Sequence, residues 1–420
     1  MSSKDNQNRN WLIILIFIIS LSLILYMINV FGVFGLIWWE IAYYFLIPCI
    51  LGAIWAYRRI LGVKKLRIQK YKHKLVAFSL IVFIGFSVFA VIPFAYVQPL
   101  GDQFERKFKE KFGNNYWQDI PGEYRKRLKS PGNYFDNKDY RYFRNENVSV
   151  KKDIKYGGGE YQIMDKYEDK TIKGDDKPAL IWVHGGGTAE GSDKATPDGV
   201  RACTYFASIG FVSFSIEYIS ALVKPFPQGV KDVRKAIVHI KRNEEKYDID
   251  NESIVLMGPS RGGHLVTLCA YTGASNDSWW QEHGGNYTVE DLKVACVIDL
   301  YGAVDPFFPA KHGNNFLARR NEILLDGTPE EREKIYKKHT VKNYISNDCP
   351  PTLILQGTHD RMVWAGESRE LHKELNKEDV FNIYLEIDFG QHGFDAIPGT
   401  AGNDLAYYFI PRFILLVLYG

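Results

Sequence analysis

The chain has 420 residues, with 52 Lys and Arg against 49 Asp and Glu, a formal net charge of +3 and only 5 Cys. This length allows a sizeable globular domain plus an additional segment, and so few cysteines exclude a disulfide-dense scaffold. Residues 1–97 carry ten basic and two acidic residues, which leaves 42 basic and 47 acidic residues for the remainder. The larger part is mildly acidic and shows no clustered basic motif, so we expect no nucleic-acid partner.

The first 97 residues contain three apolar segments long enough to cross a bilayer. Between positions 11 and 57 the only charged side chain is Glu40, and this stretch is too long for one crossing of about 20 residues. Residues 11–31, 36–57 and 75–97 are therefore predicted to be three transmembrane helices. Together they make residues 1–97 a membrane anchor, and the lipid bilayer an expected partner.

The loop between the second and third predicted spans indicates the orientation. Residues 58–74 contain eight Lys and Arg and no acidic residue, a composition typical of a cytoplasmic loop. With three spans, everything after residue 97 would then lie on the opposite side. We expect a multi-pass protein of the cell membrane whose larger domain is extracytoplasmic.

The rest of the chain divides into a short polar segment and one large domain. Residues 98–147 are charged and aromatic with Pro-Gly breakers, which predicts a juxtamembrane stalk or a cap. From residue 148 onward, short apolar runs such as 211–214 and 253–257 alternate with helical periodicity, as in residues 230–242. This pattern predicts an α/β domain with a mostly parallel sheet over residues 148–420, and residues 407–418 as its closing helix rather than a further span.

The cysteines of the large domain leave two interpretations open. Their neighbours are apolar, so they could pair in an oxidising exterior or remain buried thiols, and packing in the core is favoured. No close Cys and His spacing indicates a metal site, and no cofactor is expected. The four residues are Cys203, Cys269, Cys296 and Cys349.

Two glycine-rich motifs carry the chemistry. Positions 258–262 read Gly-Pro-Ser-Arg-Gly after an apolar strand, the G-x-S-x-G pattern that places a serine on a sharp turn between a strand and a helix. Positions 184–187 read His-Gly-Gly-Gly after another apolar run, and glycine amides of this kind can stabilise a developing oxyanion. Together the motifs indicate a serine hydrolase with Ser260 as the nucleophile.

A serine nucleophile needs a base and an orienting acid, and both have candidates downstream. Asp360 follows the apolar run 352–355, and His392 follows the run 380–385. The order Ser, Asp, His is that of α/β hydrolases and differs from those of chymotrypsin-like and subtilisin-like proteases. Glu217 is an alternative acid, but it precedes Ser260 and breaks this order.

On these motifs, residues 148–420 resemble the carboxylesterase branch of the α/β hydrolases, the hormone-sensitive-lipase-like and feruloyl-esterase-like enzymes. Further motifs that carry the resemblance are Phe-Pro-Gln at 226–228, Tyr-Gly at 301–302 and Gly-Thr-His-Asp at 357–360. The resemblance implies the α/β-hydrolase fold and a triad of Ser260, His392 and Asp360. It also implies oxyanion donors at the amides of Gly186, Gly187 and Arg261, and structural motif positions at His184, Gly185, Gly258 and Gly262.

The expected function is that of a serine esterase that cleaves short acyl esters, such as acetyl esters on small molecules, glycans or lipids. Two alternatives remain. One is a prolyl-oligopeptidase-like peptidase, although too few residues precede 148 for a propeller domain. The other is a binding module on a hydrolase fold. Because Arg261 directly follows the serine, its guanidinium could reach the substrate and favour an acidic or polar one. The sequence leaves the oligomeric state open.

Overall fold

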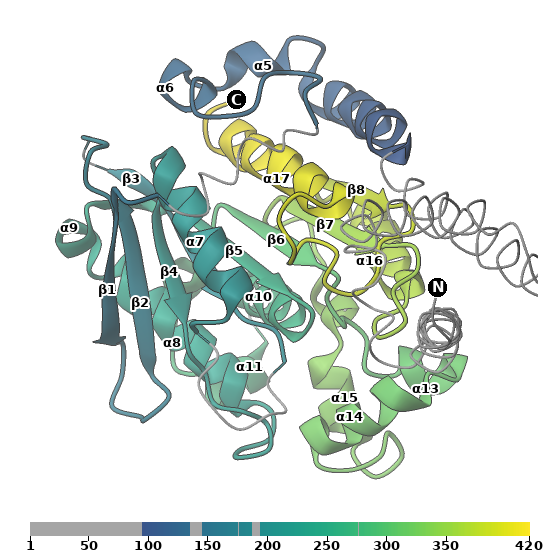
Figure 1. The fold of residues 1–420 in the computed structure, drawn as a ribbon. Coiled ribbons are helices and arrows are strands. Elements are labelled where there is room, and N and C mark those ends of the chain that lie inside the picture. The colour runs from purple at the N-terminus through teal and green to yellow at the C-terminus, as the bar shows by residue number, and fades with distance from the viewer. Residues whose placement is uncertain (1–94, 135–144, 175, 187–193, 276) are drawn as a thin grey trace, which may run out of the picture. The chain divides into compact units, whose positions relative to one another are not determined.

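The computed structural model describes residues 95–134, 145–174, 176–186, 194–275 and 277–420 (Figure 1). The predicted spans 11–31 and 36–57 lie outside these residues, as does all of 75–97 except its last three positions. Among the described residues, we find no helix with the length and apolar character needed to span a bilayer. Residues 98–420 form one compact unit.

The unit is built on an eight-stranded sheet with the strand order β1-β2-β4-β3-β5-β6-β7-β8. Strand β2 is antiparallel to both of its neighbours, and the pairs from β4 to β8 are all parallel. The expected α/β class with a mostly parallel sheet is thus confirmed. The strands are β1 (Val148–Lys155), β2 (Ile163–Asp169), β3 (Lys177–Val183), β4 (Val212–Ile216), β5 (Ile249–Pro259), β6 (Cys296–Leu300), β7 (Thr352–Gly357) and β8 (Asn382–Ile387).

The central strands β3, β4, β6 and β7 are almost entirely buried because helices cover both faces of the sheet. In β3, every residue from Ala179 to Val183 is fully buried, and Leu180 pairs with Ser213 on one side and Val255 on the other. A strand buried on both faces reads as a continuous apolar run rather than an alternating one. The outer strand β1, in contrast, is largely exposed.

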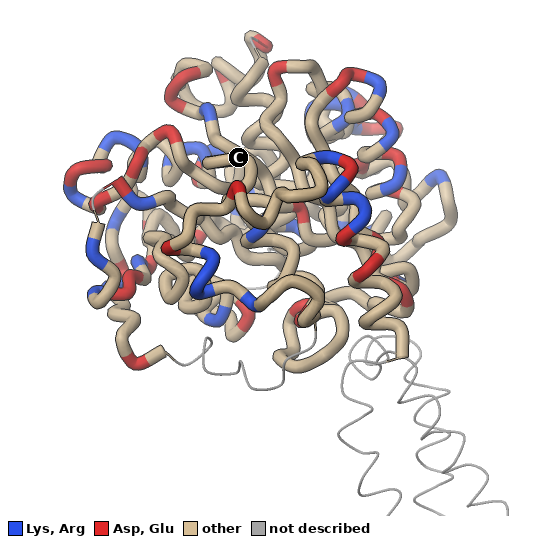
Figure 2. The backbone as a smooth tube through the Cα atoms, turned by 90° about the horizontal axis from the view of Figure 1, so that it is seen from above, with Lys and Arg blue, Asp and Glu red and all other residues tan. Residues whose placement is uncertain are grey.

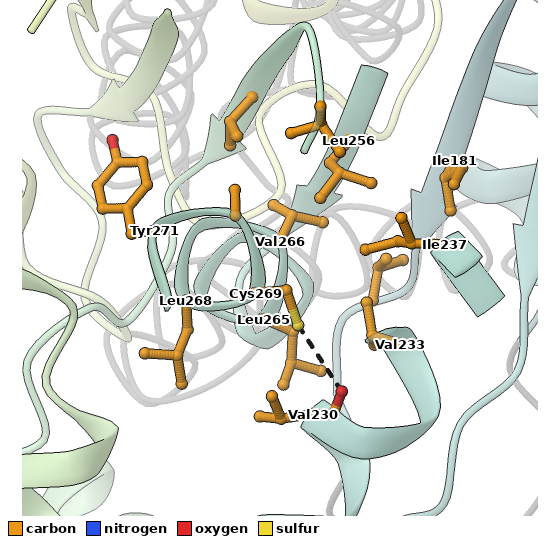
Figure 3. Close-up of a cluster of buried hydrophobic side chains, with 14 of the residues drawn as sticks. Ile181, Val230, Val233, Ile237, Leu256, Leu265, Val266, Leu268, Cys269 and Tyr271 are labelled. Atoms are coloured by element: carbon orange, nitrogen blue, oxygen red, sulfur yellow. Dashed lines mark hydrogen bonds between the residues drawn. The ribbon is translucent and has the colours of Figure 1, made fainter. Parts of the chain in front are cut away.

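Helices α7 (Pro197–Ile209) and α17 (Ala401–Tyr419) lie on the same side of the sheet, where the Tyr205 hydroxyl donates to the Tyr407 carbonyl at 3.2 Å. Helices α8 (Gln228–Lys241), α10 (Arg261–Gly273) and α16 (Ala365–Lys377) cover the other face. Figure 3 shows α10 in the middle of this second layer, with Leu265 and Cys269 packed towards Val230 and Val233 of α8. The helix that follows the serine is therefore anchored by core packing on both sides.

Residues 98–134 pack along α17. They contain all but the first three residues of a helix over residues 95–112, and the short helices α5 (Tyr116–Asp119) and α6 (Gly122–Arg125). Figure 1 shows α5 and α6 beside α17. The ring of Phe409 lies 5.5 Å from that of Phe104 and 5.0 Å from that of Phe108. Lys129 pairs with Asp404 at 2.8 Å. The closing helix α17 is thus held from its outer side as well, and Pro411 lies inside it.

The remaining helices fill two insertions and one short loop. Between β6 and β7 lie α13 (Phe308–His312), α14 (Asn315–Leu325), α15 (Glu333–His339) and the 3₁₀ helix η3 (Val341–Tyr344). This insertion meets the loop before α8, where the Phe226 amide donates to the Leu324 carbonyl at 3.1 Å. The others are α9 (Glu244–Tyr247), α11 (Ser278–His283) and α12 (Val289–Leu292).

The cysteines and the surface charges of the domain both match the sequence-based expectations. All four cysteines of the domain are free and buried, as core packing predicted. Figure 2 shows acidic and basic residues interspersed around residues 98–420.

Candidate active site

Ser260 stands on a sharp turn between β5 and α10. Its backbone has φ 54° and ψ −121°, a conformation that residues with a side chain seldom adopt. The Ser260 amide donates to the Leu300 carbonyl of β6 at 2.7 Å, and its own carbonyl accepts from the His264 amide at 3.1 Å. Backbone held in such a region is typical of functional sites. The turn therefore presents the serine hydroxyl beyond the carboxyl end of the sheet.

The glycines at 258 and 262 are required for this turn by close packing. A Cβ at Gly262 would lie 2.0 Å from the Val183 carbonyl oxygen, and one at Gly258 would lie 2.6 Å from the Gly262 carbonyl carbon. Backbone segments approach this closely only where no side chain intervenes. These two glycines thus let β3, β5 and the start of α10 come together beneath Ser260.

The structure brings the three residues of the predicted triad into one chain of hydrogen bonds. His392 Nε2 lies 2.9 Å from Ser260 Oγ, and His392 Nδ1 lies 2.8 Å from Asp360 Oδ2. Because a carboxylate can only accept, Nδ1 carries the proton and Nε2 is free to accept from the serine hydroxyl. The three residues come from the ends of β5, β7 and β8, which all point the same way in the parallel sheet. This arrangement can take a proton from Ser260 as it attacks a carbonyl group.

Asp360 is fixed by four donors, including a residue that the sequence analysis missed. Its Oδ1 accepts from the amides of Met362 at 2.8 Å and Val363 at 2.9 Å. Its Oδ2 accepts from His392 and, at 3.3 Å, from the side chain of Gln356. Gln356 is fully buried near the end of β7, directly after the apolar residues Leu353 to Leu355, and that polar residue at the end of an apolar run was the available signal.

Tyr301 and Asp395 support the histidine from the other side, and both were missed as site residues. The ring of Tyr301 packs edge-on against that of His392, with 4.8 Å between the centroids. The Tyr301 hydroxyl donates to Asp395 Oδ1 at 2.5 Å. Burial raises the pKa of Asp395 to about 6, although the bond from Tyr301 opposes the shift. This pair ties the end of β6 to the loop that carries His392.

His184 has a structural role beside the serine turn. Its Nε2 lies 3.1 Å from Glu217 Oε1, and its ring stacks on Tyr218 at 4.2 Å between centroids. The Tyr218 hydroxyl donates to the His184 carbonyl at 2.9 Å. Glu217, the alternative acid, is therefore bonded to His184, and Asp360 is the acid that contacts His392. This network fixes the chain just before the glycine motif.

The glycine motif is only partly described. A Cβ at Gly185 would lie 3.0 Å from the Pro259 carbonyl oxygen and 3.5 Å from Ser260 Cβ, so this segment runs directly against the serine. Gly186 adopts φ +81°, a conformation that glycine reaches without strain. Arg261 is the first residue of α10, and an amide in that position has no partner within its helix. Gly187, the third predicted oxyanion donor, lies outside the described residues.

The comparisons with known proteins bear on the part of the chain that holds this site. Residues 164–375, just over half of the chain, match the family model BD-FAE. The chain belongs to the BD-FAE family. The BD-FAE match contains Ser260 and Asp360 and ends before His392.

Curated relatives of this BD-FAE chain include two esterases of Mycobacterium tuberculosis. Esterase LipC is 25% identical over 256 residues, which are 60% of this chain and 62% of LipC. Esterase LipQ is 24% identical over 271 residues, which are 64% of this chain and 62% of LipQ. The chain thus spans less than two thirds of the length of either relative.

Solved structures show that the BD-FAE domain has the α/β-hydrolase fold. Esterase B from Lactobacillus rhamnosis superposes with a TM-score of 0.56 at 17% identity, over 77% of this chain and 96% of that one. A truncated carbohydrate esterase from gut microbiota superposes with a TM-score of 0.51 at 21% identity, over 64% of this chain and 98% of that one. At these identities the likeness concerns the fold alone.

Proposed function

We propose that this protein is a membrane-anchored serine esterase that hydrolyses short-chain carboxylic esters, such as acetyl esters of small molecules, glycans or lipids. The observation that carries the proposal is the hydrogen-bonded chain from Ser260 through His392 to Asp360. Membership of the BD-FAE family and the esterase relatives LipC and LipQ support the same reaction class.

The geometry suits an acyl-enzyme mechanism in two halves. Ser260 Oγ attacks the ester carbonyl while His392 Nε2 takes its proton, and Asp360 stabilises the imidazolium that forms. His392 then returns the proton to the leaving alcohol, which leaves the acyl group on Ser260. In the second half, His392 deprotonates a water molecule that attacks the acyl-enzyme, and Ser260 recovers its proton as the acid departs.

The amides of Gly186, Gly187 and Arg261 are the donors we propose for the tetrahedral oxyanion. Gly185 lies against Ser260, and the Arg261 amide is the first of α10. Donors that are already oriented towards the position of the developing charge lower the barrier without reorganisation during the reaction.

Labelling with a fluorophosphonate tests the nucleophile. The wild-type chain should react once and lose its activity on 4-nitrophenyl acetate, and Ser260→Ala should neither label nor turn over. A folded wild-type chain that remains unlabelled would instead support a binding module. A panel of 4-nitrophenyl esters with two to twelve acyl carbons then tests the short-chain preference, which is wrong if activity rises with chain length.

The membrane anchor is proposed from the sequence, because the segments that carry it lie outside the described residues. Full-length protein expressed in bacterial cells should remain in the membrane fraction after a carbonate wash, and a chain that begins at residue 98 should not. A membrane-impermeant fluorophosphonate should label Ser260 in intact spheroplasts if the domain is extracytoplasmic. Labelling only after lysis would place the domain in the cytoplasm and contradict the predicted orientation.

A further inference from the structure

Three residues in or against the first turn of α10 leave buried side-chain nitrogens without a hydrogen-bond partner. Among the described residues, the unpaired atoms include Arg261 Nε, His264 Nδ1, and both ring nitrogens of His339. Arg261 and His264 belong to the first turn of α10, and His339 is the last residue of α15 in the insertion after β6. Buried polar atoms without hydrogen bonds are rare in folded proteins, and several of them in one place can hydrogen-bond a group that binds there.

These side chains form one cluster. The rings of His264 and His339 stack with 3.9 Å between their centroids, and His264 Nε2 lies 2.9 Å from the His339 carbonyl oxygen. The charge of Arg261 is close enough to lower the pKa of both histidines. The cluster therefore joins the turn that carries the serine to the insertion between β6 and β7.

The cluster carries one positive charge. Burial is the main cause that lowers the pKa of His264 to about 3 and that of His339 well below its ordinary value, so both rings are neutral at pH 7. Burial also lowers the pKa of the Arg261 guanidinium, and only its bond to the Tyr218 hydroxyl opposes the shift. No carboxylate in the described part of the chain forms an ion pair with Arg261. Arg261 is partly buried, and a charge taken even partly out of water without a counter-charge is costly, so an anion beside it would offset that cost.

Helix α8 adds to the positive potential at the same place. A Cβ on Gly229, the second residue of α8, would lie 3.7 Å from Arg261 Nη2 and 3.4 Å from the ring of Tyr218. Residue Pro227, which precedes this 14-residue helix, makes no side-chain hydrogen bond to its first turn. The start of a helix carries a partial positive charge and attracts anions. The guanidinium and the start of α8 therefore add to the same positive potential.

We infer that Arg261, with His264 and His339, forms a binding subsite for a carboxylate carried by the ester substrate. A guanidinium binds a carboxylate through two parallel hydrogen bonds, which explains an arginine rather than a lysine at this position. Because Arg261 directly follows the nucleophile, we place the carboxylate on the part of the substrate that adjoins the scissile ester. The inference rests on the proposed esterase function and specifies its substrate class.

Two matched pairs of esters test the subsite and distinguish the two sides of the ester bond. Ethyl hydrogen succinate and ethyl succinamate place a carboxylate or an amide on the acyl side. The alcohol side is probed by 3-acetoxybenzoate and 3-acetoxybenzamide. With the full-length chain, we expect kcat/KM to be at least tenfold higher for the acid than for the amide in one of the two pairs.

Variants of the arginine give the decisive comparison. Arg261→Gln should lower the acid-to-amide ratio at least tenfold, and Arg261→Lys should retain part of it. Arg242→Gln is the matched control, since Arg242 is an exposed arginine that follows α8 at its other end, and it should leave the ratio unchanged. Labelling of Ser260 by a fluorophosphonate verifies that each variant has a folded active site. The free acid that corresponds to the preferred ester, succinate or 3-hydroxybenzoate, should slow this labelling in the wild type and not in Arg261→Gln.

The possible results separate the two proposals. If the wild type reacts with the fluorophosphonate and hydrolyses both amide-bearing esters, but does not prefer the acid-bearing esters, the carboxylate subsite is wrong and the esterase proposal stands. A wild type that neither labels nor cleaves any ester overturns the esterase itself. Glu190 and Asp193 lie outside the described residues. If Glu190→Gln or Asp193→Asn creates a preference for acids that the wild type lacks, then Arg261 is paired internally and the subsite is wrong.

Discussion

Tyr301 contacts His392 with the edge of its ring, while its hydroxyl is bonded to Asp395, three residues further along the same loop. Tyr301, the residue that follows β6, has φ 44°, so a second residue with unusual backbone geometry lies beside the serine turn. The loop after β8 is therefore held at two points, by the ring at His392 and by the hydroxyl at Asp395. We infer that these two contacts fix the position of the His392 ring relative to the Ser260 hydroxyl.

Tyr301→Phe tests the hydroxyl half of this contact. The ring against His392 remains, but the buried carboxylate of Asp395 loses its donor, which should cost about 1–3 kcal/mol of stability at pH 7.5. We expect kcat to fall more than KM changes, because the histidine is displaced and the substrate pocket is not. Urea unfolding and steady-state kinetics measure both effects. In the control Tyr205→Phe, which removes a bond from α7 to the Tyr407 carbonyl, stability should fall while kcat per folded molecule is retained.

Asp360→Asn tests the orienting acid. An amide can present a donor to His392 Nδ1, so the ring would adopt the tautomer in which Nε2 cannot accept the serine proton. We expect kcat to fall by about 10⁴-fold, the loss seen when the carboxylate of a serine triad is replaced by an amide. Glu217→Gln is the comparison, since Glu217 contacts His184 and should lower kcat far less. Equal losses in the two variants would contradict the assignment of Asp360.

Gly262→Ala tests the packing under the serine turn. Its Cβ would lie 2.0 Å from the Val183 carbonyl oxygen, so β3 and α10 would have to separate. We expect destabilisation of about 3 kcal/mol, the upper end of the usual cost of overpacking, together with loss of fluorophosphonate labelling. At Gly158, a Cβ would meet no atom within 4 Å, and Gly158→Ala should change stability by less than about 0.5 kcal/mol. Thermal unfolding of both variants gives the comparison.

The sequence predicted which residues would meet because each follows a strand of one parallel sheet. Ser260, Asp360 and His392 come after β5, β7 and β8, and such strands end at the same edge. The predicted α/β fold follows from the same alternation of short apolar runs and helices. That Gly258 and Gly262 have structural roles was likewise readable from the local motif, although their close approach to neighbouring backbone is seen only in the structure.

The supporting contacts could not be predicted in this way, because they depend on packing between distant segments. His339 reaches the start of α10 through an insertion of three helices, and nothing near residue 339 indicates that destination. Asp395 is found only through its bond to Tyr301, which lies 94 residues earlier in the chain. Local periodicity identifies elements and their order, but it does not show which polar side chains from different elements share a buried space.

Asp299 leads to a pH-dependent prediction, because it is a fully buried acid directly beneath the serine turn. Its Oδ1 accepts from the Gly302 amide at 2.8 Å, and its Oδ2 has no partner among the described residues. Burial raises its pKa from 3.8 to about 7. Between these two values the folded state keeps a proton that the unfolded state has released, so stability falls as the pH rises from about 4 to 7. The loss amounts to about 4 kcal/mol at most.

Asp299→Asn should remove this loss. The asparagine oxygen can still accept from Gly302, and the residue no longer ionises, so the variant should be more stable than the wild type by about 4 kcal/mol at pH 8 and by only about 2 kcal/mol at pH 5. Urea unfolding at both pH values measures the difference. Asp326→Asn replaces an exposed acid at the end of α14 and should leave the difference between pH 5 and pH 8 as it is in the wild type. If Asp299→Asn is less stable than the wild type by the same amount at both pH values, the carboxylate is ionised at both, and a hydrogen-bond donor outside the described residues stabilises its Oδ2.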